Sequence, residues 1–293
     1  MDKFNQAFQY NFYQTKEFAD FCSKITKIPL EEKIIENEKI FVLKNKNISI
    51  GNYSNSFCRE MQAQNIQYMQ ILPELNSVAE RPSYIEYSIF HKTIYEAAFK
   101  SYRSSFADAL RKGRKFPHET KIIRRPSGSL IKKIYEIYSR QMKRHNSFIF
   151  SQTFFENFFA CPSAFLFLVE HQQIIIAYFC CFQYKGCIYV SIGGGDPRYF
   201  NLQPSNKIYD ELIRYACQKK LDIHFGIGEH NSGYQQFKQN AGLLCYKTER
   251  FPNNEKFLKL TAPLLNFNIT GKFLALVSGI IPYSITYLVM PFS

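Results

Sequence analysis

No tryptophan and no C-x-x-C pair occur in this 293-residue sequence, and its 8 cysteines are scattered along the chain. Zinc requires ligands at short, regular spacings, so the cysteines give no support for a metal site. The N-terminal residues, Met1–Gln6, show no apolar h-region of the kind that a secretory signal peptide contains. We therefore expect no metal, reduced cysteine thiols and a cytoplasmic protein.

The last part of the chain lacks charge. No charged side chain occurs from Phe273 to Met290, a length at the lower limit for a membrane-spanning helix. Gly279 and Pro282 interrupt the run, so packing on the protein body or on a second copy, contact with a membrane surface and a membrane-spanning segment all stay open. We expect residues 257–293 to form an apolar tail that supports a homodimer or peripheral attachment at the inner membrane.

Positive charge is abundant but unevenly distributed. The net charge is +13, and residues 91–150 alone hold 15 basic and 4 acidic side chains. Such a segment attracts the phosphates of tRNA or of an anionic membrane, whereas a solvated helix face is the alternative. The contact residues expected are Arg111, Lys112, Arg114 and Lys115.

Apolar periodicity predicts an α/β protein. In residues 1–90, segments 40–43 and 48–50 flank a polar turn and predict a hairpin within an abbreviated α/β region. A helix over Leu130–Arg144 is expected to begin at a capping serine, Ser127 or Ser129. The other patterns predict helices over Thr93–Lys115 and Gln152–Phe159, then an antiparallel meander of strands Ala164–Val169, Ile174–Phe182 and Cys187–Ile192.

A glycine-rich turn is predicted after the last of these strands, followed by a helix that runs to about Lys220. Glycines let backbone N–H groups approach a pyrophosphate, and a helix N-terminus adds favourable partial charge. A plain strand-to-helix connection, capped by a polar side chain, is the alternative. The residues expected to bind a cofactor here are Gly193, Gly194, Gly195, Gln203, Ser205 and Asn206.

A short strand over Leu221–Phe225 is expected to break at Gly226, and a helix carrying Lys238 to end at Gly242 in the left-handed conformation. Between them, Glu229 and His230 are candidate general bases, because the pKa of either side chain can be tuned toward neutrality. An exposed polar loop that caps the next helix is the alternative. Asp196 is a second candidate acid or base.

Three places in the chain resemble the FemAB-like branch of the GNAT acyltransferase superfamily, which includes peptidoglycan-bridge aminoacyltransferases. They are the basic helix Ala109–Lys115, the turn Gly193–Asn206 and the ending Phe225–Gly242. The ending is similar to the branch's closing pattern "dfG…gl..fK...G", although His224 stands at the usual aspartate position. The resemblance covers about half of the chain, from Tyr102 to Phe251.

The resemblance implies a carrier-bound donor. GNAT enzymes hold the pyrophosphate of coenzyme A in a Q/R-x-x-G-x-G/A loop, and the segment 202–206 here, Leu-Gln-Pro-Ser-Asn, lacks the second and third glycines. The donor expected is therefore acyl-CoA or an aminoacyl-tRNA. Lys238 matches the lysine of the closing pattern, which implies contact with donor or acceptor; a solvated lysine is the alternative.

Together these features predict a GNAT-like mixed, mostly antiparallel sheet flanked by helices, with a truncated N-terminal α/β half. The expected parts are residues 1–90, an acyltransferase domain over 91–256 and the tail 257–293. The expected function is acyl or aminoacyl transfer from the carrier to an amine acceptor. The alternative is a non-catalytic GNAT-fold module tethered to RNA or membrane.

Overall fold

The computed structural model describes residues 12–35, 38–44, 48–50, 59–61, 63–64, 66–71, 85–145 and 149–251. The apolar tail, and the membrane or dimer role expected of it, lies outside these residues.

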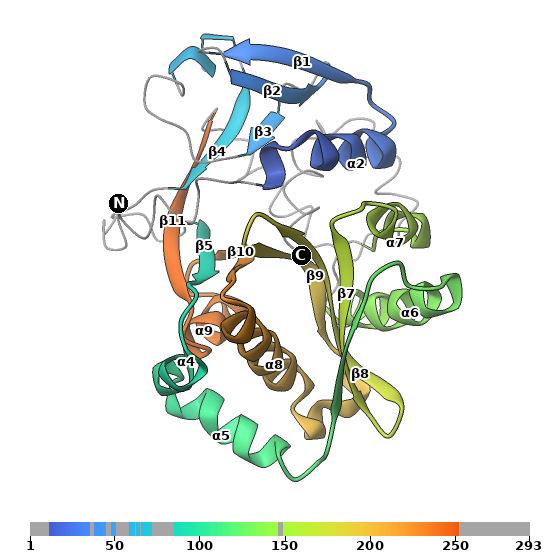
Figure 1. Cartoon of the computed structure of the whole chain (residues 1–293), viewed down its shortest axis with the longest axis vertical. Coiled ribbons are helices and arrows are strands. Elements are labelled where there is room, and N and C mark those ends of the chain that lie inside the picture. Colours follow the sequence, from blue (N-terminus) through green and yellow to red (C-terminus); the bar gives the residue numbers. More distant parts are fainter. Residues whose placement is uncertain are drawn as a thin grey trace.

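The described strands form one long mixed sheet and a separate two-stranded unit (Figure 1). All neighbouring pairs in the long sheet are antiparallel except β3–β4 and β9–β10. The order across the long sheet is β3 (Ile48–Ile50), β4 (Gln67–Ile71), β11 (Leu244–Phe251), β5 (Ile85–Phe90), β10 (Asp222–Glu229), β9 (Cys187–Gly195), β8 (Ile174–Tyr184), β7 (Ala164–His171) and β6 (Glu119–Ile123).

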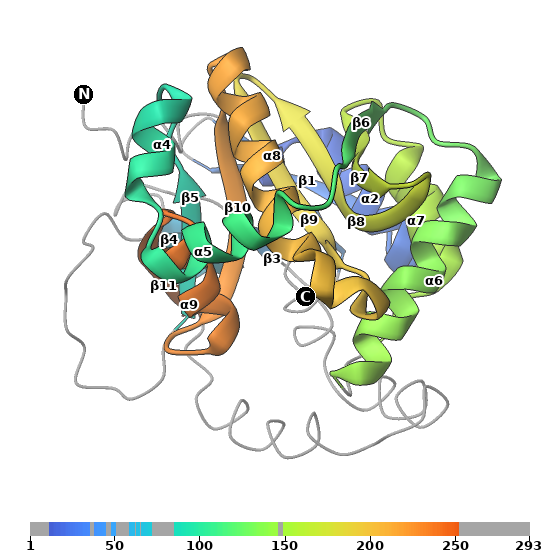
Figure 2. The same cartoon turned by 90° about the horizontal axis from the view of Figure 1, so that it is seen from below.

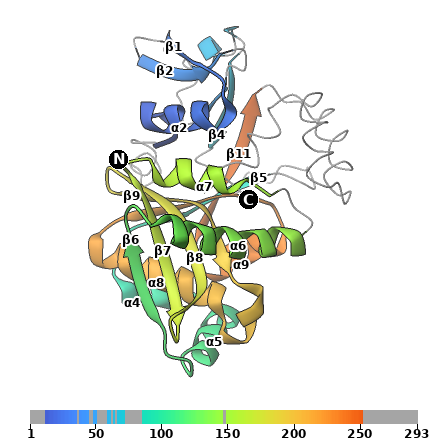
Figure 3. The same ribbon diagram turned by 90° about the vertical axis from the view of Figure 1, so that its right-hand side faces the viewer.

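Helices cover both faces of this sheet. Figure 3 shows α6 and α7 on one side of β7 and β8, with α8 on the other. The first group is η1 (Phe12–Gln14), α2 (Lys16–Thr26), α6 (Gly128–Arg144) and α7 (Gln152–Phe159); the second is α4 (Tyr95–Ser101), α5 (Ser104–Gly113), α8 (Pro204–Lys219) and α9 (Gly233–Asn240).

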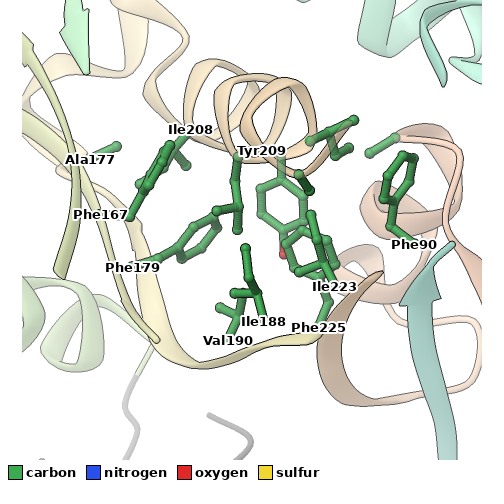
Figure 4. Packing of buried hydrophobic residues seen from close by; sticks show 14 of the residues in the cluster. Phe90, Phe167, Ala177, Phe179, Ile188, Val190, Ile208, Tyr209, Ile223 and Phe225 are labelled. Atoms are coloured by element: carbon green, nitrogen blue, oxygen red, sulfur yellow. The ribbon is translucent and has the colours of Figure 1, made fainter. Parts of the chain in front are cut away.

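Because successive strand side chains point to opposite faces, the central strands supply two cores at once. On β7, Leu166 packs with α6 and α7, whereas Phe167 packs beneath α8. Figure 4 shows the α8 core, in which Phe179, Tyr209 and Phe225 point toward one another. The rings of Tyr209 and Phe225 are stacked with centroids 4.6 Å apart. Burying each such ring stabilises the fold by roughly 2–3 kcal/mol.

The predicted fold class is confirmed, and so are the meander β7–β8–β9 and the helix capped by Ser127, whose side chain accepts from the Leu130 N–H. Other predictions of local structure are wrong. The single helix over Thr93–Lys115 is two helices, because Tyr102 is extended and the Arg103 N–H donates to Asn240 O.

The predicted hairpin of segments 40–43 and 48–50 is also absent. Strand β2 (Glu38–Leu43) pairs antiparallel with the preceding strand β1 (Leu30–Ile35) instead. Strand β3 pairs with β4 in parallel. The charged strand Leu30–Ile35, with three charged side chains in the run LEEKII, gave too weak an apolar alternation to be recognised as a partner.

Candidate functional site

The two parallel strands at the sheet centre stop pairing part-way along their length. Pairing of β9 with β10 runs from Cys187–Asp222 to Tyr189–His224. Both strands then continue, β9 to Gly195 and β10 to Glu229. Beyond Tyr189, the β9 edge toward β10 therefore offers backbone N–H and C=O groups that this ladder does not use.

A β-bulge lies where the separation begins. Cys181 pairs with Val190 and Cys180 with Ile192, so Ser191 is the extra residue on β9. The Ser191 side chain is buried, and its Oγ has no hydrogen-bond partner. Sequence reasoning missed this residue, because nothing in the run Cys187–Ile192 marks a bulge.

The predicted glycine turn is instead the end of β9. Gly193, Gly194 and Gly195 pair with β8, and the glycines are required by close packing. A Cβ on Gly194, whose φ is +147°, would lie 2.5 Å from Gln141 Nε2 on α6, and one on Gly195 would lie 2.6 Å from Pro204 Cγ on α8.

Helix α8 follows β9 after the short helix η2 (Pro197–Leu202). In Figure 2, α8 lies near β9 and β10, with α4, α5 and α9 on the β5 and β11 side. The Gln203 N–H donates to Phe200 O and the Lys207 N–H to Gln203 O, while Pro204 has no N–H. The N–H groups of Ser205 and Asn206 in the first turn are the ones that a helix leaves unsatisfied. The first turn of α8 thus has two backbone N–H donors, fewer than a glycine-rich phosphate loop offers.

Asp196 is fully buried between two arginines. Its Oδ2 accepts from Arg140 at 2.9 Å and from Arg198 at 2.8 Å. Burial alone would raise the pKa of Asp196, but the hydrogen bonds from Arg198 and Arg140 outweigh it and hold the pKa below its usual value. A carboxylate held ionised in this way is a weak base, so the geometry favours a structural role for Asp196.

His230 lies in the polar loop after β10, as predicted, and has a partner that sequence reasoning missed. Its Nδ1 is 2.6 Å from Glu86 Oε1 on β5. The pairing of β5 with β10, Glu86 opposite Gly228, brings the two side chains together. Glu229 ends β10 in the backbone, and its side chain lies outside the described part of the chain.

Lys238 on α9 is fully buried, which excludes the solvated lysine. Its Nζ donates to Ile227 O at 3.1 Å and to Gly226 O at 3.3 Å. Both carbonyls belong to the irregular stretch of β10 where the register with β5 shifts between His224 and Ile227. Desolvation lowers the pKa of Lys238 to about 7, against the opposing influence of Cys245 and Glu86.

Other buried polar side chains surround Lys238. Gln235, one turn earlier on α9, donates through Nε2 to Ser88 Oγ at 2.9 Å and to Cys245 Sγ at 3.0 Å. The strand Ile85–Phe90 places Glu86 and Ser88 on the face toward α9, and both are buried. The signal available in the sequence was this pair of polar residues alternating with Ile85, Tyr87 and Ile89 in a short apolar strand.

His224, at the family's aspartate position, belongs to the opposite face of the sheet. It is buried, with Nδ1 3.1 Å from Tyr87 Oη and its ring stacked on Tyr189 at 4.6 Å between centroids. Its departure from the family pattern therefore does not remove a carboxylate from the cluster around Lys238.

The basic segment is exposed on and just after α5. Arg111 forms an ion pair with Asp108, and the Arg114 guanidinium lies 5.6 Å from the centre of the Phe99 ring. The aromatic side chains nearby, Tyr102 and Phe106, are buried in the α8 core and so are not available to stack on bases.

Within the segments that the structure describes, no group of three or more His, Cys, Asp or Glu side chains is placed to hold a metal ion. None of the described helices combines the length and apolar character needed to cross a bilayer.

Residues 100–239 match the family model described as an acetyltransferase (GNAT) domain. A comparison with curated protein sequences found no match. Among solved structures, the chain is similar to FemX, with 12% identity, a TM-score of 0.61 and coverage of 85% of this chain and 94% of that one. It is also similar to L-PGS from Bacillus licheniformis, with 9% identity, a TM-score of 0.53 and coverage of 88% and 100%.

A third similar structure is the C-terminal domain of a putative lysylphosphatidylglycerol synthetase from Agrobacterium fabrum, with 8% identity, a TM-score of 0.51 and coverage of 87% and 97%. The matched model identifies residues 100–239 as an acetyltransferase (GNAT) domain, and the fold of the chain is GNAT-like. The resemblance to the FemAB-like branch is confirmed at the level of fold, through FemX.

Proposed function

We propose that this protein transfers an acyl or aminoacyl group from an activated carrier, a coenzyme A thioester or an aminoacyl-tRNA ester, to an amine acceptor. The observation that carries the proposal is the separation of β9 from β10 beyond Tyr189 and His224. It leaves an extended backbone edge on which the donor's acyl arm can lie, and α8, whose first turn can hold a carrier phosphate, follows β9 after η2.

The carrier phosphate would lie at the N–H groups of Ser205 and Asn206. From there the acyl arm would follow β9 toward the bulge. The unpartnered Ser191 hydroxyl, and backbone N–H groups on the β9 edge beyond Tyr189 that the β10 ladder does not use, would be donors for the acyl carbonyl oxygen, on which negative charge develops as the amine attacks.

The Glu86–His230 pair would receive the proton that the amine loses. With Nδ1–H directed at the Glu86 carboxylate, Nε2 is the ring nitrogen that accepts a proton. The amine nitrogen forms the new C–N bond, the C–S or C–O bond to the carrier breaks, and the departing sulfur or oxygen leaves protonated. The donor is already activated, so positioning supplies most of the rate enhancement.

Lys238 would act as a positioning residue, because its ammonium is fully buried against Gly226 O and Ile227 O. It fixes the irregular stretch of β10 and so the spacing between that strand and β9. The expected contact between Lys238 and substrate thus becomes an indirect one in this proposal.

We also propose that the exposed basic segment, Arg111, Lys112, Arg114 and Lys115, binds the phosphates of a tRNA carrier. The burial of Tyr102 and Phe106 supports contact with the phosphate backbone, which does not depend on sequence.

Binding of the two donors can be compared directly by calorimetry with acetyl-CoA, a long-chain acyl-CoA and aminoacyl-tRNA, each beside its unacylated carrier. At least one donor should bind. If the carrier phosphates contribute most of the binding free energy, the donor and its unacylated carrier should bind with affinities within about tenfold of each other. The donor assignment is wrong if none of them binds.

A further inference from the structure

One oxygen of Glu86 is buried without a partner. The residue is 6% exposed. Oε1 lies 2.6 Å from His230 Nδ1, and Oε2 is inaccessible to solvent and has no hydrogen-bond donor. A buried carboxylate oxygen without a donor is costly, by roughly 1–3 kcal/mol or more. Such a group needs a physical explanation, and a ligand that completes its hydrogen bonding is one.

The side chains around Glu86 come from two strands, one helix and the loop after β10. Ser88 follows it on the same face of β5, and Lys247 is its cross-strand neighbour on β11. His230 lies in the loop after β10. Lys238 on α9 interacts electrostatically with Glu86. The Lys238 ammonium donates to two backbone carbonyls of β10. Glu86 lies beside Gly228, in the part of β10 that no longer pairs with β9.

We propose that Glu86 Oε2 binds the amino group of the acceptor, in its ammonium form, once the side chains that cover this oxygen move aside, and that Glu86 thereby selects primary amines. This inference rests on the proposed function, since it assigns the acceptor end of the same site. A carboxylate binds an ammonium through a charge-assisted hydrogen bond, which is stronger than its bond to a neutral hydroxyl.

The geometry also discriminates among cations. A guanidinium binds a carboxylate best through both oxygens at once. His230 already occupies Oε1, so one oxygen remains, and a single-point donor such as an alkylammonium fits it better. A lysine-like amine is therefore preferred over an arginine-like guanidine, and both over an alcohol.

The chemical step then balances. The bound ammonium gives one proton to the Glu86–His230 pair and becomes a neutral amine. The amine nitrogen attacks the acyl carbon, the bond from that carbon to the carrier sulfur or oxygen breaks, and the second amine proton leaves with the carrier. Glu86 touches the reacting nitrogen and is in this sense a catalytic residue.

The test uses full-length protein with 15N-labelled histidine side chains and three probes of similar size, n-butylamine, n-butylguanidine and 1-butanol. The His230 ring resonances, assigned with His230→Gln, should shift in a saturable way with n-butylamine and at least tenfold more weakly with the other two. In Glu86→Gln, the affinity for n-butylamine should fall at least tenfold. The matched control is Glu211→Gln, which alters a second carboxylate–histidine pair, with His118 at 3.1 Å, and should leave the affinity unchanged.

Equal binding of n-butylamine by Glu86→Gln, or the absence of a His230 shift in the wild type, would overturn the proposal and leave Oε2 with water. If Glu86→Gln does not fold, the preference among the three probes in the wild type still decides. No donor is present in this experiment. Failure of acyl transfer with amine binding intact would therefore refute the proposed function and not the role of Glu86.

Discussion

Buried charged side chains have different surroundings in two regions of the molecule. One is the connection from β9 to α8, which contains Asp196, and the other is the cluster of polar side chains around Lys238. In the connection, the buried Asp196 carboxylate has two arginine partners. In the cluster, Glu86 keeps one oxygen without a partner and Lys238 has a depressed pKa. Compensated charge stabilises a fold, whereas uncompensated charge is retained where chemistry or a ligand requires it. In the proposed function, the connection supports the donor and the cluster takes up the proton.

The largest effect is expected at Asp196. Asp196→Asn keeps the shape of the side chain but leaves Arg140 and Arg198 without a counter-charge, which should lower the free energy of unfolding by about 3 kcal/mol. Urea denaturation measures this. The control is Asp108→Asn, which removes an exposed pair with Arg111 and should cost well under about 1 kcal/mol. A fully stable Asp196→Asn protein without activity would instead make Asp196 catalytic.

Lys238 should give the protein a distinctive pH dependence. Its folded pKa of about 7 lies below the ordinary value of 10.5, so between these pH values the unfolded chain holds a proton that the folded chain does not. The stability of the wild type should therefore rise with pH, relative to Lys238→Met, by roughly 2 kcal/mol between pH 7 and 9. Parallel stability curves for the two proteins would contradict the buried, depressed state of Lys238.

The proposed contact between the acyl donor and the start of α8 can be tested by removing one backbone N–H group. Ser205→Pro removes one N–H donor from the first turn of α8, where proline is compatible with the helix. Donor affinity, measured by calorimetry, should fall roughly tenfold, the loss expected for one hydrogen bond to a charged group. Ser205→Ala keeps the N–H and should bind as the wild type does. A matching loss in both variants would assign the effect to the hydroxyl.

The smallest effect on stability is expected at the basic segment. Reversing the charge of Arg111, Lys112, Arg114 and Lys115 should change stability little, since all four are exposed. It should, however, abolish salt-sensitive binding of tRNA, measured by filter binding over a range of salt concentrations. The control reverses Lys132 and Lys133 on α6, which are exposed as well. If the control variant loses tRNA affinity to the same extent, the basic segment is only a solvated helix face and not a specific contact.

Much of the fold was accessible from the sequence. Helix Gln152–Phe159 and the meander over Ala164–Ile192 have strong apolar periodicity and clear turn residues, so their prediction was correct. Gly242 was also predicted correctly, with a φ of +77° at the end of α9. The hairpin prediction failed because register among short, half-charged strands is decided by tertiary contacts.

The site was less accessible than the fold. Local patterns led to Gly193–Gly195, whose glycines serve packing, and to Asp196, which is ion-paired. Glu86 was missed because it is far from His230 in the chain, and only the pairing of β5 with β10 brings the two together. Sequence resemblance identified Lys238, but its burial and its two carbonyl partners required the three-dimensional structure.

The central claim is transfer of an acyl group to a primary amine, and one measurement tests it directly. Purified full-length protein is mixed with acetyl-CoA or with aminoacyl-tRNA, each with n-butylamine, and the butylamide product is followed by mass spectrometry. The account predicts butylamide from at least one donor, with the rate reduced at least tenfold in Glu86→Gln and unchanged in Glu211→Gln. Formation of no butylamide above the protein-free background from either donor would contradict it.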